Sequence, residues 1–249
     1  MTTYEMLMAV KENKGAGYIV LIDPDKQSIE QSIGIAKQAE KEGADAIFIG
    51  GSLLFFSVFD DFIAQIKKHV RIPVIIFPGG TNQVSNHADA ILFMSIISSR
   101  NPDVLMGKQI LAAPVIKLLG LEAISTAYML IESGKMTSAE FMSDTRPIPR
   151  DKNDIAVAHA LAAEYIGMKL IYLEAGSGAV HTVPDEMIRA VTNYVSVPVI
   201  VGGGIRTPEV ARQKVNAGAS FIVTGNVLED AIEPGRIEQF SAAIHYKTT

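Results

Sequence analysis

Two side chains suited to metal binding stand directly after short apolar runs of this sequence. Asp23 follows the run YIVLI, and Ser52 follows the run AIFI and two glycines. If both runs are neighbouring strands of a barrel, the carboxylate and the hydroxyl lie at the same end of it. Together with water and the oxygens of a bound phosphate, they form a ligand set that suits Mg²⁺. The alternative is structural, because Asp-Pro is a common turn and Ser52 can cap a helix.

Small residues follow the later apolar runs and predict a phosphate site. Glu174 ends the run LIYLE and precedes AGSGA, whose backbone amides can approach a phosphate, while Tyr172 shares its strand face. Glycine turns also follow the last two runs, as GGGI at 202–205 and TGN at 224–226. Glycine turns at the ends of the last two strands form the recurrent phosphate site of β/α barrels. The alternatives are tight loops with nothing bound and, for Tyr172, simple core packing.

The runs themselves predict strands that must position these residues. Their hydrophobicity is continuous rather than alternating, which is typical of strands buried on both faces of a parallel sheet. A further strand is expected at 121–131. The predicted strands cover residues 18–22, 46–49, 74–77, 90–94, 121–131, 170–173, 199–201 and 221–223.

Amphipathic stretches between most of these runs predict helices. Strands separated by helices of 10–15 residues indicate repeated β-α units. The predicted helices cover residues 28–42, 58–69, 103–119, 154–166, 184–194, 208–217 and 229–245. We therefore predict the α/β class and a parallel (β/α)8 barrel that occupies residues 1–249 as a single domain. An open, doubly wound sheet is the competing architecture.

Two segments depart from the regular alternation. Only twelve residues, PGGTNQVSNHAD, separate the third run from the fourth, so the third outer helix is expected to be missing or reduced to a turn or two. Its absence would leave an apolar groove on the barrel wall. Residues 132–152 are polar and contain two prolines, which predicts a long loop near the mouth of the barrel.

Composition limits the possible functions. The net charge of −5 gives no polybasic surface for nucleic acid, and the absence of cysteine excludes disulfides and thiolate chemistry. The five histidines have no metal-ligand spacing. The N-terminal residues lack the apolar core of a signal peptide, and no apolar run is long enough for a membrane anchor. A cytoplasmic location is the simplest expectation.

The sequence resembles the geranylgeranylglyceryl phosphate synthase family over nearly its whole length. The resemblance rests on LIDPDK, GGS, FPGG, FMS, SRNP, YLEAGSGA, VGGGI and FIVTGN, of which YLEAGSGA with the two later glycine loops is the most specific part. It implies a prenyltransferase that joins the C3 hydroxyl of sn-glycerol 1-phosphate to geranylgeranyl diphosphate or a related prenyl diphosphate. Diphosphate is released and an ether-lipid precursor of phospholipid biosynthesis is formed. The resemblance also implies Mg²⁺, a barrel without its third helix, and a homo-oligomer.

Carried over motif by motif, the resemblance assigns roles to particular residues. Asp23 and Ser52 would hold Mg²⁺. Glu174 and Tyr172 would be catalytic, with Glu174 holding or deprotonating the glycerol hydroxyl. Glycerol phosphate would bind at Tyr172, Leu173, Glu174, Ala175, Gly176, Ser177, Gly178, Gly203, Gly204, Gly225 and Asn226. Phe77, Phe93 and Tyr128 are candidates for the groove lining, with core packing as the alternative.

Two other kinds of protein fit parts of the same pattern. A sugar-phosphate isomerase barrel also requires an Asp after its first strand. It requires a second acidic residue after its fifth strand, where this sequence offers only Glu132. A non-catalytic phosphate-binding module would leave Asp23, Ser52 and Glu174 unexplained. Either enzyme would turn over its substrate, whereas a binding module would not.

Overall fold

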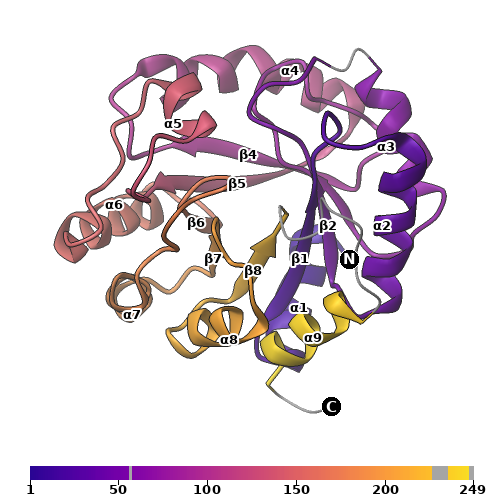
Figure 1. The fold of residues 1–249 in the computed structure, drawn as a ribbon. Helices are drawn as coiled ribbons and strands as arrows, with labels where there is room; N and C mark the ends of the chain where they lie inside the picture. Colours follow the sequence, from indigo (N-terminus) through magenta and orange to yellow (C-terminus); the bar gives the residue numbers. More distant parts are fainter. Residues whose placement is uncertain (56–57, 226–234, 247–249) are drawn as a thin grey trace.

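A closed barrel of parallel strands forms the centre of the computed structural model, which describes residues 1–55, 58–225 and 235–246 (Figure 1). Each strand pairs with the next, and β8 closes the barrel against β1. The described strands are β1 (Gly17–Ile22), β2 (Ala46–Ile49), β3 (Val74–Ile76), β4 (Ala90–Ile96), β5 (Glu122–Leu130), β6 (Leu170–Glu174), β7 (Val199–Gly202) and β8 (Phe221–Thr224). The predicted barrel is therefore confirmed, and the doubly wound sheet is wrong.

The strands are buried on both faces, as their continuous apolar runs predict. One apolar cluster consists mainly of inward-facing strand residues, including Phe48, Tyr172 and Phe221. A second cluster joins the outward-facing strand residues, such as Leu173, to the surrounding helices. Because strand side chains alternate in direction, each strand contributes to both layers.

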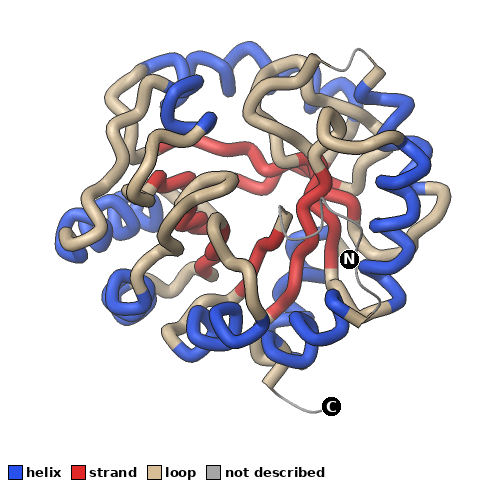
Figure 2. The backbone as a smooth tube through the Cα atoms, in the orientation of Figure 1, coloured by secondary structure: helices blue, strands red, loops and turns tan. Residues whose placement is uncertain are grey.

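Helices surround the strands, drawn in blue around red in Figure 2. The described helices are α1 (Thr3–Lys14), α2 (Ile29–Lys41), α3 (Phe59–Lys67), the π-helix η1 (Asp103–Gly107), α4 (Lys108–Leu119), α5 (Ser138–Ser143), α6 (Asn153–Tyr165), α7 (Asp185–Tyr194), α8 (Pro208–Asn216) and α9 (Arg236–Ile244). The predicted helices are confirmed to within a few residues, except that the start of the last one, 229–234, lies outside the described residues. Within the described ranges, every helix is too short or too polar to cross a bilayer.

The N-terminal helix α1 is absent from the helices predicted from sequence. The Thr2 side chain accepts a hydrogen bond from the backbone of Glu5, whose side chain accepts one from the backbone of Thr2 in return. This capping box fixes the start of the helix. Leu7 is buried in the interior cluster of the barrel, so α1 covers that cluster at its N-terminal end.

The predicted absence of the third outer helix is confirmed. Residues 77–89, between β3 and β4, contain only turns. The long loop predicted at 132–152 is present, but it contains one short helix, α5. The Thr137 side chain accepts a hydrogen bond from the Glu140 backbone at the start of α5, and the sequence TSAE carries this capping signal.

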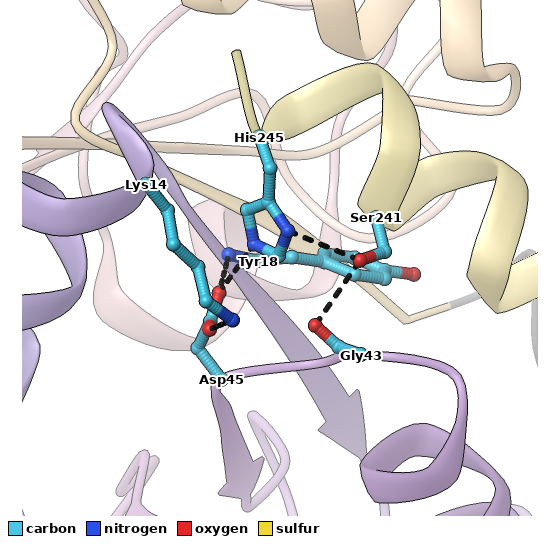
Figure 3. A network of polar contacts seen from close by, with 6 residues as sticks. All are labelled: Lys14, Tyr18, Gly43, Asp45, Ser241 and His245. Carbon is cyan, nitrogen blue, oxygen red and sulfur yellow. Dashed lines mark hydrogen bonds and ion pairs between the residues drawn. The ribbon is translucent and has the colours of Figure 1, made fainter. Parts of the chain in front are cut away.

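A buried polar network joins both ends of the chain at the N-terminal side of the barrel (Figure 3). Asp45 accepts hydrogen bonds from the Lys14 ammonium at 2.6 Å and from the backbone N–H of Tyr18 at 2.7 Å, and its carboxylate lies 2.8 Å from His245 Nε2. The Ser241 hydroxyl donates to the backbone carbonyl of Gly43. These contacts hold α1 and α9 against the barrel, on the side away from the strand ends that carry the site.

Candidate active site

A cavity of about 510 Å³ opens among the C-terminal ends of the strands. Chemistry in parallel barrels is located at this end. The cavity is lined by residues from both halves of the barrel, and most of the residues singled out from the sequence meet there. These are Asp23, Ser52, Tyr172, Glu174, Ser177, Gly178, Gly203, Gly204 and Gly225.

The remaining sequence-based candidates are placed differently. The side chains of Leu173 and Ala175 belong to the outer apolar cluster, so only their backbone can face a ligand at this end of β6. Gly176 is packed against Thr137, whose Cγ2 lies 2.5 Å from where a Cβ on Gly176 would stand. Asn226 lies outside the described residues.

Glu174 is a buried carboxylate at the centre of this arrangement. Its Oε1 accepts a hydrogen bond of 2.6 Å from the backbone N–H of Gly176. Burial raises the pKa of the Glu174 carboxyl to about 7, although the hydrogen bond from Gly176 and the nearby Tyr172 hydroxyl act in the opposite direction. A carboxyl with a pKa near neutrality is suited to accepting a proton at physiological pH.

The glycines after β7 allow the backbone to approach this carboxylate. A Cβ on Gly203 would lie 2.4 Å from Glu174 Oε1 and 2.6 Å from the backbone nitrogen of Gly176, and Gly203 has a φ of +86°. Any side chain here would collide with the β6 loop. Thr207 caps α8 directly after this turn, so the loop leads into the positive end of a helix. Backbone amides and a helix N-terminus placed in this way are able to hold an anion, and the two loops are called the cradle below.

Three aromatic side chains that contact one another line the cavity beside Glu174. The rings of Phe77 and Tyr172 are stacked with centroids 5.3 Å apart, and Tyr128 lies 5.5 Å from Tyr172. Burial raises the pKa of Tyr172 well above its usual value, so the phenol stays protonated. Its buried hydroxyl lies near the Glu174 carboxylate, but no hydrogen bond of good geometry satisfies it within the described residues. The hydroxyl is therefore placed to bind a ligand.

The cavity continues from these rings into an apolar part between β4 and α4. Phe93, Ile91 and Ile116 line this part, next to the segment where the third outer helix is absent. Phe77, Phe93 and Tyr128, which the sequence suggests as groove lining, all contact the cavity. The site thus combines a polar cradle with an apolar extension.

Asp23 and Ser52 have surroundings that fit a magnesium ion. Both line the cavity, and the carboxylate oxygens of Asp23 lie 3.0 and 3.1 Å from where a Cβ on Gly51 would stand. The Asp23 carboxylate therefore packs closely against the backbone of the loop that carries Ser52, an approach that a side chain at position 51 would hinder. Among the described residues, no group of three or more His, Cys, Asp or Glu side chains could hold a metal. A site with so few protein ligands suits Mg²⁺, which keeps water and phosphate oxygens in its coordination shell.

The cavity also contains two cationic residues for which the sequence predicts no role. Lys108, in the first turn of α4, and Arg206, directly after the glycine turn of β7, both line it. Arg206 directly follows the glycine turn at 202–205, so its position in the sequence points to the site. Lys108 is one of two lysines in α4, and nothing in the sequence distinguishes it from Lys117. Glu132, the acid that an isomerase would need, is exposed and does not line the cavity.

The fold and the cavity define a parallel β/α barrel whose strand ends carry glycine loops beside a buried carboxylate. The chain matches the PcrB family over residues 8–244. It is 45% identical to the geranylgeranylglyceryl phosphate synthase of Chitinophaga pinensis over 228 residues, which cover 92% of this chain and 90% of that protein. It is 48% identical to the enzyme of the same name from Thermococcus gammatolerans, with 89% of this chain and 86% of that protein covered.

A solved structure agrees with these relatives. The (S)-3-O-geranylgeranylglyceryl phosphate synthase of Thermoplasma acidophilum, in complex with its substrate sn-glycerol 1-phosphate, superposes with a TM-score of 0.93 at 36% identity. The match covers 98% of this chain and 99% of that one. This protein therefore belongs to the PcrB family, together with the geranylgeranylglyceryl phosphate synthases.

Proposed function

We propose that this protein is a prenyltransferase that joins the C3 hydroxyl of sn-glycerol 1-phosphate to C1 of geranylgeranyl diphosphate or a related prenyl diphosphate. The observation that carries the proposal is the position of Glu174, a buried carboxylate between a glycine cradle and an apolar extension of the same cavity. Relatives that match most of the chain carry the name of this activity.

In this proposal the phosphate of sn-glycerol 1-phosphate binds to the loops after β6, β7 and β8. The backbone amides around Gly178, Gly203 and Gly204, together with the N-terminus of α8, supply donors for its oxygens. The glycerol then extends toward Glu174 and the Tyr172 hydroxyl. Holding the nucleophile near C1 of the second substrate is a proximity effect, which lowers the barrier without any new chemistry.

The transfer forms one bond and breaks another. The C3 oxygen of the glycerol attacks C1 of the prenyl group, and the bond from C1 to the diphosphate oxygen breaks with its electron pair. The proton of the C3 hydroxyl passes to Glu174. The ring faces of Phe77, Tyr128 and Tyr172 suit the positive charge that develops on the allylic group.

Asp23 and Ser52 would hold Mg²⁺ near the diphosphate. When bound, the ion would neutralise the negative charge that develops on the diphosphate leaving group. The apolar part of the cavity, lined by Phe93, Ile91 and Ile116, would take the prenyl chain. Binding of an isoprenoid there removes apolar surface from water and so favours association.

The test of the function is transfer of label. Purified protein would be incubated with radiolabelled sn-glycerol 1-phosphate and prenyl diphosphates of increasing length, with and without Mg²⁺. We expect label in an organic-extractable product with at least one of these prenyl diphosphates. Folded protein that transfers no label to any prenyl diphosphate would contradict the proposal and favour a non-catalytic phosphate-binding module.

Replacing Asp23 tests the metal assignment. In Asp23→Asn the amide keeps the shape of the side chain but loses its charge, so we expect a roughly tenfold or larger increase in the Mg²⁺ concentration needed for half-maximal transfer. Binding of sn-glycerol 1-phosphate, measured by calorimetry without metal, should stay close to that of the native protein. An unchanged Mg²⁺ dependence would remove Asp23 from the metal site.

We also propose that the protein forms a homo-oligomer. Leu111, Val115 and Leu118 lie at helical spacing on the outer side of α4, and all three are exposed. An apolar stripe of this kind is unfavourable in water and is commonly covered by another subunit. We expect light scattering to give a mass above 26.8 kDa, the mass of one chain. A monomeric mass at micromolar concentration would contradict this expectation.

A further inference from the structure

The loops after β2 and β3 lie against each other where the third outer helix is absent and the segment from β3 to β4 consists of turns. These loops carry part of the cavity wall, including Gly51, Ser52 and Gly79. The turns at 77–89 therefore have to hold the loops in place by other contacts.

Gln83 supplies such contacts from within these turns. Its side chain is only 2% exposed. The Nε2 group donates to the backbone carbonyl of Gly51 at 2.9 Å, and Oε1 accepts from the backbone N–H of Gly79 at 3.1 Å. One buried amide thus bridges the loop after β2 to the loop after β3, with donor and acceptor both used.

The two loops that Gln83 bridges are in direct backbone contact. A Cβ on Gly79 would stand 2.1 Å from the carbonyl oxygen of Gly51 and 2.9 Å from Cα of Ser52. Because side chains are absent at this contact, the loops approach as closely as backbone allows. A shift of the loop after β3 would therefore move Ser52 directly.

The loop with Ser52 is also held from the side of β1. The Asp25 carboxylate accepts a hydrogen bond of 2.7 Å from the backbone N–H of Phe55. The carboxylate of Asp23, two residues before Asp25, lies directly against Gly51 in this loop. Asp25 and Gln83 thus fix the Ser52 loop from opposite sides.

We infer that Gln83 is a positioning residue that holds Ser52 opposite Asp23 and so prepares the half of the cavity that takes the diphosphate of the prenyl substrate. This inference rests on the proposed function and deepens it. Gln83 acts through the loop after β2 and has no part in the glycerol phosphate cradle, whose loops follow β6, β7 and β8. Its loss should therefore affect one substrate and spare the other.

The test measures the two substrates separately in Gln83→Met, which keeps the length of the side chain and removes both hydrogen bonds. The probes are a geranylgeranyl thiolodiphosphate, which does not transfer its prenyl group readily, with Mg²⁺, and sn-glycerol 1-phosphate alone, both measured by calorimetry. We expect the thiolodiphosphate to bind roughly tenfold more weakly. Binding of sn-glycerol 1-phosphate should remain within about twofold of the native value.

Two further variants complete the experiment. Gln38→Met makes the same change on α2, where the Gln38 side chain donates a hydrogen bond to Glu42, and should leave both affinities unchanged. If Gln83→Met does not fold, Gln83→Glu keeps the acceptor for Gly79 and loses the donor to Gly51, so the same selective weakening is expected. Unchanged thiolodiphosphate binding, or equal weakening of both ligands, would overturn the inference. A native protein that binds no thiolodiphosphate and transfers no label would instead overturn the proposed function, and the inference with it.

Discussion

Glu174→Gln is expected to lower the rate of prenyl transfer by roughly 10²- to 10⁴-fold, the range in which a positioned base contributes. The amide keeps the size of the side chain and can still accept the hydrogen bond from Gly176, so the loop after β6 should stay in place. It cannot take the proton of the glycerol hydroxyl. Calorimetry should accordingly find sn-glycerol 1-phosphate bound nearly as well as in the native protein.

The pH dependence distinguishes a base from a residue that only holds the substrate. A base must be ionised, and the pKa of Glu174 is about 7. We expect the native rate to fall about tenfold for each pH unit below this value, and the residual rate of Glu174→Gln to be flat there. A native profile without an acid limb, or near-normal turnover in the variant, would show that Glu174 is not the base.

The same substitution should stabilise the fold in alkaline solution. The pKa of Glu174 is raised in the folded protein, so its contribution to stability is fully present below the unfolded pKa of about 4.5 and is lost as pH rises through about 7. The difference between the two values corresponds to at most roughly 3 kcal/mol. Thermal unfolding of Glu174→Gln at pH 8 should thus occur at a higher temperature than that of the native protein, and at the same temperature near pH 4.

The position of Glu174 was predictable from the sequence, whereas its perturbed pKa was not. Its place at the end of an apolar run predicts a strand end in a barrel, because continuous hydrophobicity is the mark of parallel strands. The missing third helix was predictable for a similarly local reason, since twelve residues between two strands leave no room for it. The perturbed pKa was not predictable, because it arises from burial by loops distant in sequence, such as the turn at Gly203.

Gln83 and Asp45 were missed for the same physical reason. Glutamine in a turn and aspartate before a strand are ordinary residues locally, and only the closed barrel brings them to their partners. Asp45 meets His245, 200 positions away in the sequence, and Gln83 meets Gly51 across a gap of 32. Local patterns predict elements, whereas side-chain partners depend on how these elements are assembled.

The two ends of the barrel should respond to mutation in opposite ways. At the mouth, Glu174 is buried and has no cationic partner among the described residues, so its ionised form lowers the stability of the fold while its pKa stays near neutrality. At the N-terminal end, Asp45 is equally enclosed but is satisfied by Lys14, Tyr18 and His245. In β/α barrels the first end carries the chemistry and the second the stability.

Asp45→Asn is therefore expected to destabilise the fold by about 3 kcal/mol, the lower part of the range for breaking a buried ion pair, because Lys14 is partly exposed. For a chain of this size, that corresponds to a decrease of roughly 6–12 °C in the unfolding temperature. Transfer activity at 25 °C should be unchanged, since Asp45 lies away from the cavity. A matched control is Asp60→Asn, which alters an exposed pair with His87 and should cost less than about 1 kcal/mol.

Acid should abolish the difference between the native protein and Asp45→Asn. Burial by itself raises the pKa of the Asp45 carboxyl, but hydrogen bonds from His245, Lys14 and the Tyr18 backbone outweigh it, and the pKa lies below its ordinary value. A lowered pKa gives stability that is present above the unfolded pKa and is lost as pH falls through the folded one. The two unfolding temperatures should consequently converge below about pH 4. A difference that persisted undiminished in acid would mean that Asp45 stabilises the barrel by its shape and not by its charge.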